Sequence, residues 1–408
     1  MSTSHQHVRA WAPAALVLAM ATAVSACGPG TTSSTGTAVQ ARAGAPATPS
    51  VPPVEVSVAP ADPGTGVRLD TPITVSVARG DLQQVTVTAP DGTPLEGGLD
   101  PTGATWTSTG ELAPGTRYAV HVVATDTAGE TVTRDSAVTT LTPATTAFPA
   151  VAPLDGSTVG VGMPIIVTLD EPVADDRRDE VESNLHVTTT PTAVEGSWSW
   201  QSDSKVEFRP KEYWPAQTAV HLDVDLGDVE VAPGVWGTTR DIDFQVGSAM
   251  VSTVDLDAHT LTVTRDGEVL RTIPITAGQS GHGGRYVTRS GTKVIMSREE
   301  SRQMDAETTG VSPDDPEYYN VAVEYAMRLT NSGEFLHAAP WSVASQGSAN
   351  VSHGCTGMST EDARWLFERS KVGDVVVFTG TDRGVEDGNG FSMWNETWEE
   401  WTAGSALT

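Results

Sequence analysis

Two segments of the chain resemble each other, and this internal repeat constrains the fold more than any other feature of the sequence. A proline opens an apolar run at Pro72 and again at Pro164, an offset of 92 residues. Near the ends of the copies, similar runs begin at Pro114 and Pro215, where the offset has grown to 101 residues. The second copy therefore carries an insertion of about nine residues, which we place in the acidic stretch 175–182.

The two copies, at 55–144 and 145–248, have the pattern of short antiparallel strands. Apolar residues alternate, as at Val75 and Val77, and turn dipeptides such as Asp91-Gly92 separate the runs. About 100 residues for each copy fits an immunoglobulin-like β-sandwich. Gly and Pro are abundant, with 39 and 26 residues, which favours a mainly β protein with a few short helices.

Length and charge limit the remaining possibilities. At 408 residues the chain is longer than one hydrophobic core usually organises, so further domains are expected beside the repeat. The formal net charge is −28. A nucleic-acid partner needs clustered Lys and Arg, and the sequence has no such cluster, so we exclude nucleic-acid binding.

Residues 1–26 have the features of an export signal. Arg9 precedes an apolar stretch from Trp11 to Ala23 that is too short to span a bilayer. The following run, Val24-Ser25-Ala26-Cys27-Gly28, resembles the lipobox of bacterial lipoproteins, in which the cysteine is acylated and becomes the new N-terminus. The resemblance implies lipidation of Cys27, with an ordinary cleaved signal peptide as the alternative.

Residues 27–54 would form a flexible tether, because Gly, Pro, Ser, Thr and Ala dominate this stretch and cannot bury enough apolar surface to fold. About 27 flexible residues span on the order of 30 Å. We therefore expect an extracytoplasmic protein that is anchored to the cell membrane by its lipid and faces the cell wall. Cys27 and Cys355 are the two cysteines, so lipidation would leave Cys355 as the one thiol.

Residues 249–380 have the pattern of a third domain that is also β-rich. Strands at 254–256, 260–265 and 268–275 would open it as a meander, and a strand at 375–378 would close it.

Helices are predicted at 316–329 and 360–370, and Ser359 or Thr360 can cap the second. A tail at 381–408 places three tryptophans at helical spacing, which predicts a small amphipathic subdomain packed on the third domain. These are Trp394, Trp398 and Trp401.

The residues that carry chemistry are His337 and the run Ser352-His353-Gly354-Cys355. A thiol is only slightly ionised at neutral pH, so a catalytic cysteine needs a base beside it, and His337 and His353 are both candidates. Backbone N–H groups near Gly354 and Cys355 could form an oxyanion hole, helped by a helix that would follow. Two other possibilities remain at this point: a metal site made of both histidines and the cysteine, and an inert buried thiol.

The arrangement of these residues resembles the signature of YkuD-type L,D-transpeptidases. The likeness extends to the actinobacterial lipoprotein branch of that family, which carries two N-terminal immunoglobulin-like domains before its β-rich catalytic domain. The residues that carry it are Ser332-Gly333, His337-Ala338-Ala339-Pro340-Trp341-Ser342-Val343, Ser352-His353-Gly354-Cys355, Trp365, Lys371-Val372-Gly373-Asp374-Val375-Val376 and Trp394-Asn395.

The resemblance implies a reaction. Cys355 would attack the meso-diaminopimelate carbonyl of a donor tetrapeptide stem and expel D-alanine, with His337 as general base and acid. The thioester would pass to the side-chain amine of an acceptor stem and give a 3→3 cross-link in peptidoglycan. Passing it to water (an L,D-carboxypeptidase) or to a protein amine are alternatives, and a non-catalytic wall-binding spacer is a third. No cofactor is implied, and carbapenem β-lactams are the expected inhibitors.

The resemblance also assigns roles to further residues. Ala338 occupies the position that orients the base. Because alanine has no polar side chain, only its backbone carbonyl can bond the imidazole of His337. Ser352, His353 and Gly354 would shape the site around the thiol. The family usually has Asn or Arg two residues after the cysteine, and here that position is Gly357. The implied substrate-binding residues are Tyr319, Ser332, Ser352, Trp341 and Met304.

Overall fold

The computed structural model describes residues 54–61 and 64–408. The predicted signal peptide, the lipidation site Cys27 and the tether up to residue 53 lie outside the described residues. No helix within the described ranges is long and apolar enough to cross a membrane.

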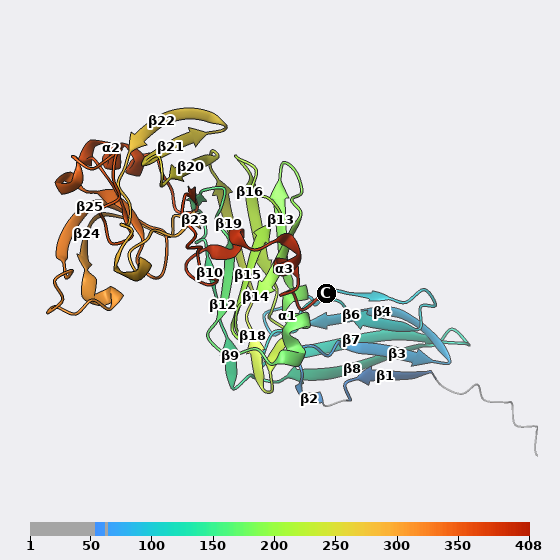
Figure 1. Cartoon of the computed structure of the whole chain (residues 1–408). Coiled ribbons are helices and arrows are strands. Elements are labelled where there is room, and N and C mark those ends of the chain that lie inside the picture. The colour runs from blue at the N-terminus through green and yellow to red at the C-terminus, as the bar shows by residue number, and fades with distance from the viewer. Residues whose placement is uncertain (1–53, 62–63) are drawn as a thin grey trace, which may run out of the picture. The chain divides into compact units, whose positions relative to one another are not determined.

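The first domain is a sandwich of two four-stranded sheets (Figure 1). One sheet has the order β1 (Glu55–Ala59), β3 (Thr74–Ala78), β6 (Thr105–Ser108), β5 (Gly97–Leu99). The other has the order β2 (Gly64–Val67), β8 (Thr131–Thr140), β7 (Arg117–Asp126), β4 (Gly80–Thr88). The alternating valines explain the sandwich, because Val75 of β3 and Val122 of β7 are both fully buried in the core between the sheets.

The second domain repeats this topology strand for strand. Its first sheet is β10 (Pro149–Ala152), β12 (Ile165–Leu169), β15 (Lys205–Pro210), β14 (Gly196–Trp200). Its second is β11 (Thr158–Val159), β19 (Arg240–Val246), β16 (Ala219–Val224), β13 (Leu185–Thr190). A small third sheet joins β17 (Glu230–Ala232), β18 (Val235–Gly237) and β9 (Thr145–Ala147). The predicted pair of similar sandwiches is therefore confirmed.

The insertion that lengthens the second copy lies in the predicted stretch 175–182. In the first domain only Arg79 lies between β3 and β4. In the second domain, the equivalent connection from β12 to β13 contains the 3-10 helix η1 (Asp175–Arg177) and the helix α1 (Arg178–Ser183). Val181 of α1 is fully buried, so the insertion extends the core.

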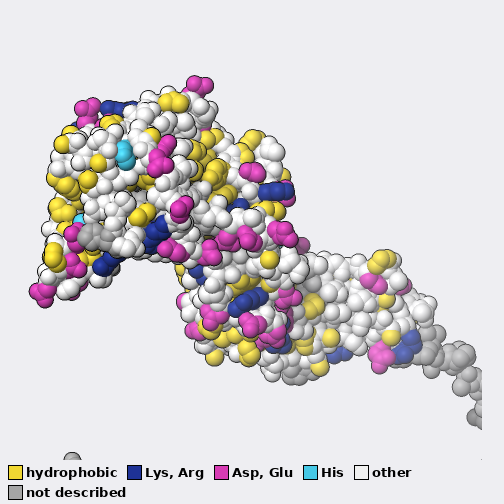
Figure 2. Space-filling view, viewed as in Figure 1, with side chains coloured by type: hydrophobic (Ala, Val, Ile, Leu, Met, Phe, Trp, Pro, Cys, Tyr) yellow, Lys and Arg dark blue, Asp and Glu magenta, His cyan; other side chains and the backbone are white. Residues whose placement is uncertain are grey.

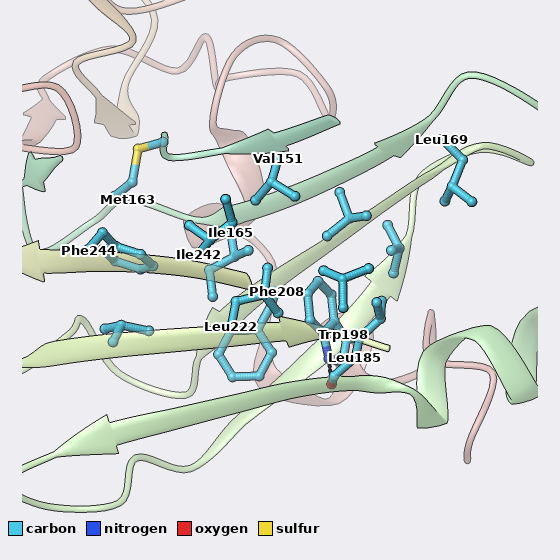
Figure 3. Packing of buried hydrophobic residues seen from close by; sticks show 14 of the residues in the cluster. Val151, Met163, Ile165, Leu169, Leu185, Trp198, Phe208, Leu222, Ile242 and Phe244 are labelled. Carbon is cyan, nitrogen blue, oxygen red and sulfur yellow. Dashed lines mark hydrogen bonds between the residues drawn. The ribbon is translucent and has the colours of Figure 1, made fainter. Parts of the chain in front are cut away.

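The core of the second domain is rich in aromatic side chains (Figure 3). The rings of Trp198 and Phe208 meet edge to face at 5.3 Å, and Phe208 stacks on Trp214 at 5.9 Å. The indole N–H of Trp198 donates to the carbonyl of Leu185 across the sandwich, so this polar group is satisfied inside the core.

The third domain is built on two sheets. The larger has the order β22 (Glu268–Pro274), β21 (Thr260–Arg265), β20 (Met250–Asp255), β28 (Val375–Thr379), β23 (Gly291–Val294), which confirms the predicted meander and closing strand. The smaller has the order β24 (Ser297–Asp305), β25 (Asn320–Arg328), β26 (Phe335–Ala338), β27 (Thr356–Met358). The helix α2 (Thr360–Phe367) contacts β25 and β26. Apolar side chains from both sheets and α2 form one core.

One of the two predicted helices is wrong. The segment 316–329 contains the strand β25, which pairs with β24 along its whole length. The run Val321-Ala322-Val323 suits a strand, and the long pairing outweighs the helical spacing of the apolar residues. The second helix is confirmed as α2, and the hydroxyl of Ser359 accepts the N–H of Asp362 as its N-cap.

The tryptophan-rich tail packs on the third domain and also contacts the second domain, which the sequence did not predict. The 3-10 helix η5 (Ser392–Asn395) lies on β23, whereas α3 (Trp398–Thr402) lies on β14 of the second domain. Arg209 of the second domain explains this placement, because its guanidinium lies 5.1 to 5.3 Å from three indole rings. These rings belong to Trp394, Trp398 and Trp401. Their role is therefore structural.

Glycines allow the second and third domains to approach closely. The N–H groups of Gly160 and Gly162 donate to the carbonyls of Val372 and Gly373, each at 2.8 Å. A Cβ on Gly160 would lie 2.2 Å from the backbone nitrogen of Asp374.

We expect Gly160→Ala to lower the free energy of unfolding by about 1–3 kcal/mol, because the added methyl group meets backbone that cannot move away cheaply. Urea denaturation measures this. Gly98→Ala is the matched control, since a Cβ there meets nothing within 4 Å. Equal stabilities of the two variants would contradict the close contact.

Candidate active site

Two short parallel strands bring the candidate nucleophile and base together. β26 carries His337, and Cys355 directly precedes β27. In the register of this pair, Leu336 lies opposite Thr356 and His337 lies opposite Gly357. Cys355 and His337 therefore lie at the same edge of the smaller sheet, although 17 residues separate them in the sequence.

Both residues line one cavity of about 490 Å³. Its walls are mostly apolar, which is typical of a site that excludes water around a few polar groups. Of the residues that the sequence singled out, the following line it: Met304, Tyr319, His337, Trp341, Ser352, His353, Cys355 and Gly357. Thr276, Val321, Val323, Ala339, Ser342, Ser345 and Val351 complete the lining and were not predicted.

Cys355 is held as a protonated thiol. Desolvation by burial raises the pKa of Cys355 to about 12, although a backbone hydrogen bond from Phe335 acts in the opposite direction. The sulfur donates to the carbonyl oxygen of Gly333 at 3.5 Å. At neutral pH this thiol needs a base before it can attack.

His337 has the features of that base. Its side chain is 6% exposed, and desolvation lowers its pKa below the ordinary value, so the imidazole is neutral at pH 7. Its Nδ1 lies 2.8 Å from the carbonyl oxygen of Ala338, which fixes the proton on Nδ1 and leaves Nε2 free to accept one. This hydrogen bond is the contact that the resemblance implies for the Ala338 carbonyl.

His353 lies in a different arrangement. Its Nε2 is 3.0 Å from the carboxylate of Glu317, and its ring lies between Tyr286 at 4.5 Å and Tyr319 at 5.0 Å. His353 and Gly354 form a bend, and the strand β27 begins only after Cys355. The Nε2 of His353 is therefore occupied by a carboxylate, whereas the hydrogen bond of His337 uses Nδ1.

The turn before the thiol is closed by Ser352. Its hydroxyl accepts the N–H of Gly354 at 3.1 Å and donates to the carbonyl of Cys355 at 2.6 Å. Gly354 has φ of 125°, which favours glycine, and Thr288 donates to its carbonyl. The helix expected to follow begins only at Thr360, after β27, so no helix N-terminus faces the sulfur. Within the described residues the N–H of Cys355 has no hydrogen-bond partner, which makes it a donor for an oxyanion.

The substrate-binding residues implied by the resemblance occupy distinct positions. Met304 is a buried residue of the cavity wall and Tyr319 is a half-buried one. Desolvation raises the pKa of Tyr319 to about 12, so its hydroxyl stays protonated. Trp341 is 60% exposed at the cavity, with its ring 6.0 Å from that of His337. Ser332 does not line this cavity and lies in smaller neighbouring depressions, bonded to Asn389.

Gly357 is part of the cavity lining. A Cβ at this position would lie 2.7 Å from the Cβ of Ala339, so a side chain fits only if the neighbouring chain shifts. The glycine therefore suits its close packing, and no polar side chain reaches the cavity from this position.

Known proteins similar to this chain agree with the geometry. The profile of the L,D-transpeptidase catalytic domain matches residues 249–378, and that of the bacterial Ig domain matches residues 64–230. L,D-transpeptidase 2 of Mycobacterium tuberculosis (strain CDC 1551 / Oshkosh) is 35% identical over 358 residues, which cover 87% of this chain and 85% of that protein. This chain belongs to the L,D-transpeptidase family. The resemblance to YkuD-type enzymes is confirmed.

Other relatives of this L,D-transpeptidase are consistent with the assignment. L,D-transpeptidase 5 of Mycobacterium tuberculosis (strain ATCC 25618 / H37Rv) is 32% identical and covers 87% of this chain and 78% of that protein. The solved structure of the L,D-transpeptidase LdtMt1 in complex with imipenem is 36% identical, with a TM-score of 0.50, and covers 57% of this chain and 99% of that one.

A buried ionic cluster beside the thiol was missed by the sequence analysis. In this L,D-transpeptidase the side chain of Lys293 is 0% exposed, and its Nζ lies 2.5 Å from the carboxylate of Glu334. Arg289 donates to the other carboxylate oxygen at 2.9 Å. Glu334 directly follows Gly333, whose carbonyl accepts the hydrogen bond of the thiol. The side chain of Glu334 also packs on Gly354, so this cluster lies directly behind Cys355. The signal in the sequence was slight, because Lys293 lies in the short strand β23 and Glu334 directly precedes β26.

A metal site is not supported by the geometry. Among the described residues, no three His, Cys, Asp or Glu side chains are grouped so that they could hold a metal ion.

Proposed function

We propose that this protein is a peptidoglycan L,D-transpeptidase that forms 3→3 cross-links through a thioester on Cys355. The observation that carries the proposal is the buried, neutral His337, held by the Ala338 carbonyl and lining the same cavity as the thiol. A protonated thiol beside an oriented neutral imidazole is the arrangement that nucleophilic acyl transfer requires.

In the first half-reaction, Nε2 of His337 takes the thiol proton as the sulfur attacks the diaminopimelate carbonyl of a donor tetrapeptide stem. The tetrahedral oxyanion accepts a hydrogen bond from the backbone N–H of Cys355. When the C–N bond breaks, the imidazolium gives its proton to the leaving amine, and D-alanine departs. The enzyme is left as a thioester with a neutral imidazole.

In the second half-reaction, the side-chain amine of an acceptor stem attacks the thioester carbonyl. His337 accepts a proton from that amine and returns it to the sulfur as the C–S bond breaks. The apolar cavity walls favour this transfer because they limit competition by water. The products are the cross-linked stems and the free thiol.

Lipidation at Cys27 would place this chemistry outside the cell membrane. We propose an anchored, wall-facing protein, supported by the lipobox-like run and by the composition of the tether. Palmitate labelling of the full chain beside Cys27→Ala tests this, because the label should be absent from the variant.

Mass spectrometry of products tests the reaction. The chain from Gly28 onward is incubated with a disaccharide tetrapeptide that ends in D-alanine, beside Cys355→Ala. We expect a dimer that has lost one D-alanine, absent in the variant. Tripeptide monomers alone would identify an L,D-carboxypeptidase, and no turnover would favour the spacer.

A further inference from the structure

A second cavity, of about 360 Å³, borders the turn that precedes Cys355. It shares Tyr319 and His353 with the main cavity, and Gly354, the residue before the nucleophile, also lines it. We call it the arginine cavity, because Arg285, Arg289 and Arg383 all line it. A ligand bound at Cys355 could extend into it past Gly354.

The arginine cavity carries excess positive charge. Arg289 is paired with Glu334 and Glu386, and Lys293 behind it shares Glu334. Arg383 donates to three backbone carbonyls, at Gly284, Arg285 and Val287, and its nearest carboxylate is Glu386 at 4.0 Å. With Arg285, four cations at and behind this cavity outnumber three carboxylates, which are Glu334, Glu386 and, bonded to His353, Glu317.

Arg285 is the cation that remains available. It donates one hydrogen bond to the carbonyl of Gly310 at 3.0 Å, and its guanidinium lies 5.6 Å from the ring of Tyr286. No carboxylate of the described residues lies within 4.0 Å of it. A guanidinium keeps unused donors in this arrangement, and it binds a carboxylate well.

This charge is unusual for the molecule. The whole chain has a formal charge of −28, and the face in Figure 2 carries acidic side chains alongside basic ones. A cationic cavity on an acidic protein concentrates anions locally. Its position beside the thiol directs that attraction to the substrate.

We propose that the arginine cavity binds a carboxylate of the donor stem peptide, with Arg285 as its principal ligand. The proposal rests on the proposed function, since the donor is the molecule that reaches Cys355. Two sources offer the same chemistry: the C-terminal carboxylate of the D-alanine that leaves, and the carboxylates inside the stem. Arg285 is therefore a determinant of specificity and not a catalytic residue.

The test compares three donors with the full chain from Gly28 onward. One tetrapeptide keeps all of its carboxylates, one has its C-terminus amidated, and one has its internal carboxylates amidated. Amidation of the bound carboxylate should lower kcat/KM of the wild-type protein about tenfold or more, mainly through KM. The donor that loses activity identifies the source.

Variants at Arg285 then assign the effect. Arg285→Gln should react with the acid and amide donors equally, whereas Arg285→Lys should keep part of the preference. Arg364→Gln is the control, because Arg364 is 64% exposed on α2 and bonds only Glu368. A preference that survives in Arg285→Gln, or a wild-type protein indifferent to both amidations, would overturn the proposal.

A binding measurement separates this proposal from the proposed function. Cys355→Ala cannot turn over, so isothermal titration with the acid and amide donors reports the cavity alone. Tighter binding of an acid donor, lost in Cys355→Ala/Arg285→Gln, would support the carboxylate site even if the wild-type protein formed no cross-links. Equal binding of acid and amide donors would contradict the carboxylate site even if the wild-type protein formed cross-links.

Discussion

His337→Ala should lower the rate of acyl transfer by about 10²- to 10⁴-fold, the range expected when a general base is removed. The pKa of the Cys355 thiol is raised to about 12, so almost none of it is ionised at pH 7 without help. The rate constant follows from product formation with a tetrapeptide donor. The variant keeps the strands and the cavity, because alanine fits at position 337 without new polar groups.

Both proteins should become more reactive as the pH rises, but over different pH ranges. In the wild-type protein the base must be neutral, so activity is lost as the pH falls through the lowered pKa of His337, below 6.5. In His337→Ala the thiol must ionise alone, so reaction with iodoacetamide should rise about tenfold for each pH unit up to the thiol pKa. Intact-protein mass spectrometry measures the adduct.

His353→Gln is the matched control, because this histidine belongs to the same motif but bonds Glu317. A glutamine amide can still donate to that carboxylate. Its pH profile should keep the wild-type shape. If His353→Gln loses the profile while His337→Ala keeps it, the assignment of the base is wrong.

Periodicity along the chain predicted most of the architecture. The two sandwiches could be predicted because the same alternation of valines occurs twice, at Val75 and again at Val167. Each copy also buries these valines in its own core. The insertion could be predicted because the offset between matching positions of the two copies increases along the chain. Local patterns are sufficient where an element and its partner lie in one repeat.

Long-range pairing limited the prediction of the third domain. Tyr318, Val321, Tyr325 and Leu329 have helical spacing, but the hydrogen bonds of β25 go to β24, whose position the sequence does not reveal. The same holds for the tail. Its tryptophans predicted a helix, whereas the cation that binds them, Arg209, comes from another domain.

The motif predicted residues that line the cavity, but not the residues that surround them. Cys355, His337 and the Ala338 carbonyl follow from the motif, because each role depends on residues that are close in sequence or recur in the family. Ser332 was placed in the main cavity by resemblance and lies beside it. The sequence around Arg285 gives no sign of its role, because only the fold shows that this arginine lines a cavity beside Gly354.

Lys293→Met should lower the free energy of unfolding by about 3 kcal/mol, at the lower end of the range for breaking a buried ion pair. The variant leaves Glu334 charged and buried, with Arg289 as its remaining partner. Adding Glu334→Leu removes that charge, so Lys293→Met/Glu334→Leu should recover most of the loss. Urea denaturation of both variants measures the difference, and a double variant as unstable as the single one would contradict a penalty from the unpaired carboxylate.

The same pair of variants reports on Cys355. The charge of Glu334 raises the pKa of the thiol, and the charge of Lys293 lowers it. Lys293→Met should therefore raise the pKa of Cys355 further and slow its alkylation at pH 8, while the double variant should react at nearly the wild-type rate, because the two effects are removed together. If the cluster is only structural, these variants will change the free energy of unfolding and leave the alkylation rate of the folded protein unchanged. The alkylation rate therefore decides whether the pair of Lys293 and Glu334 also sets the pKa of Cys355.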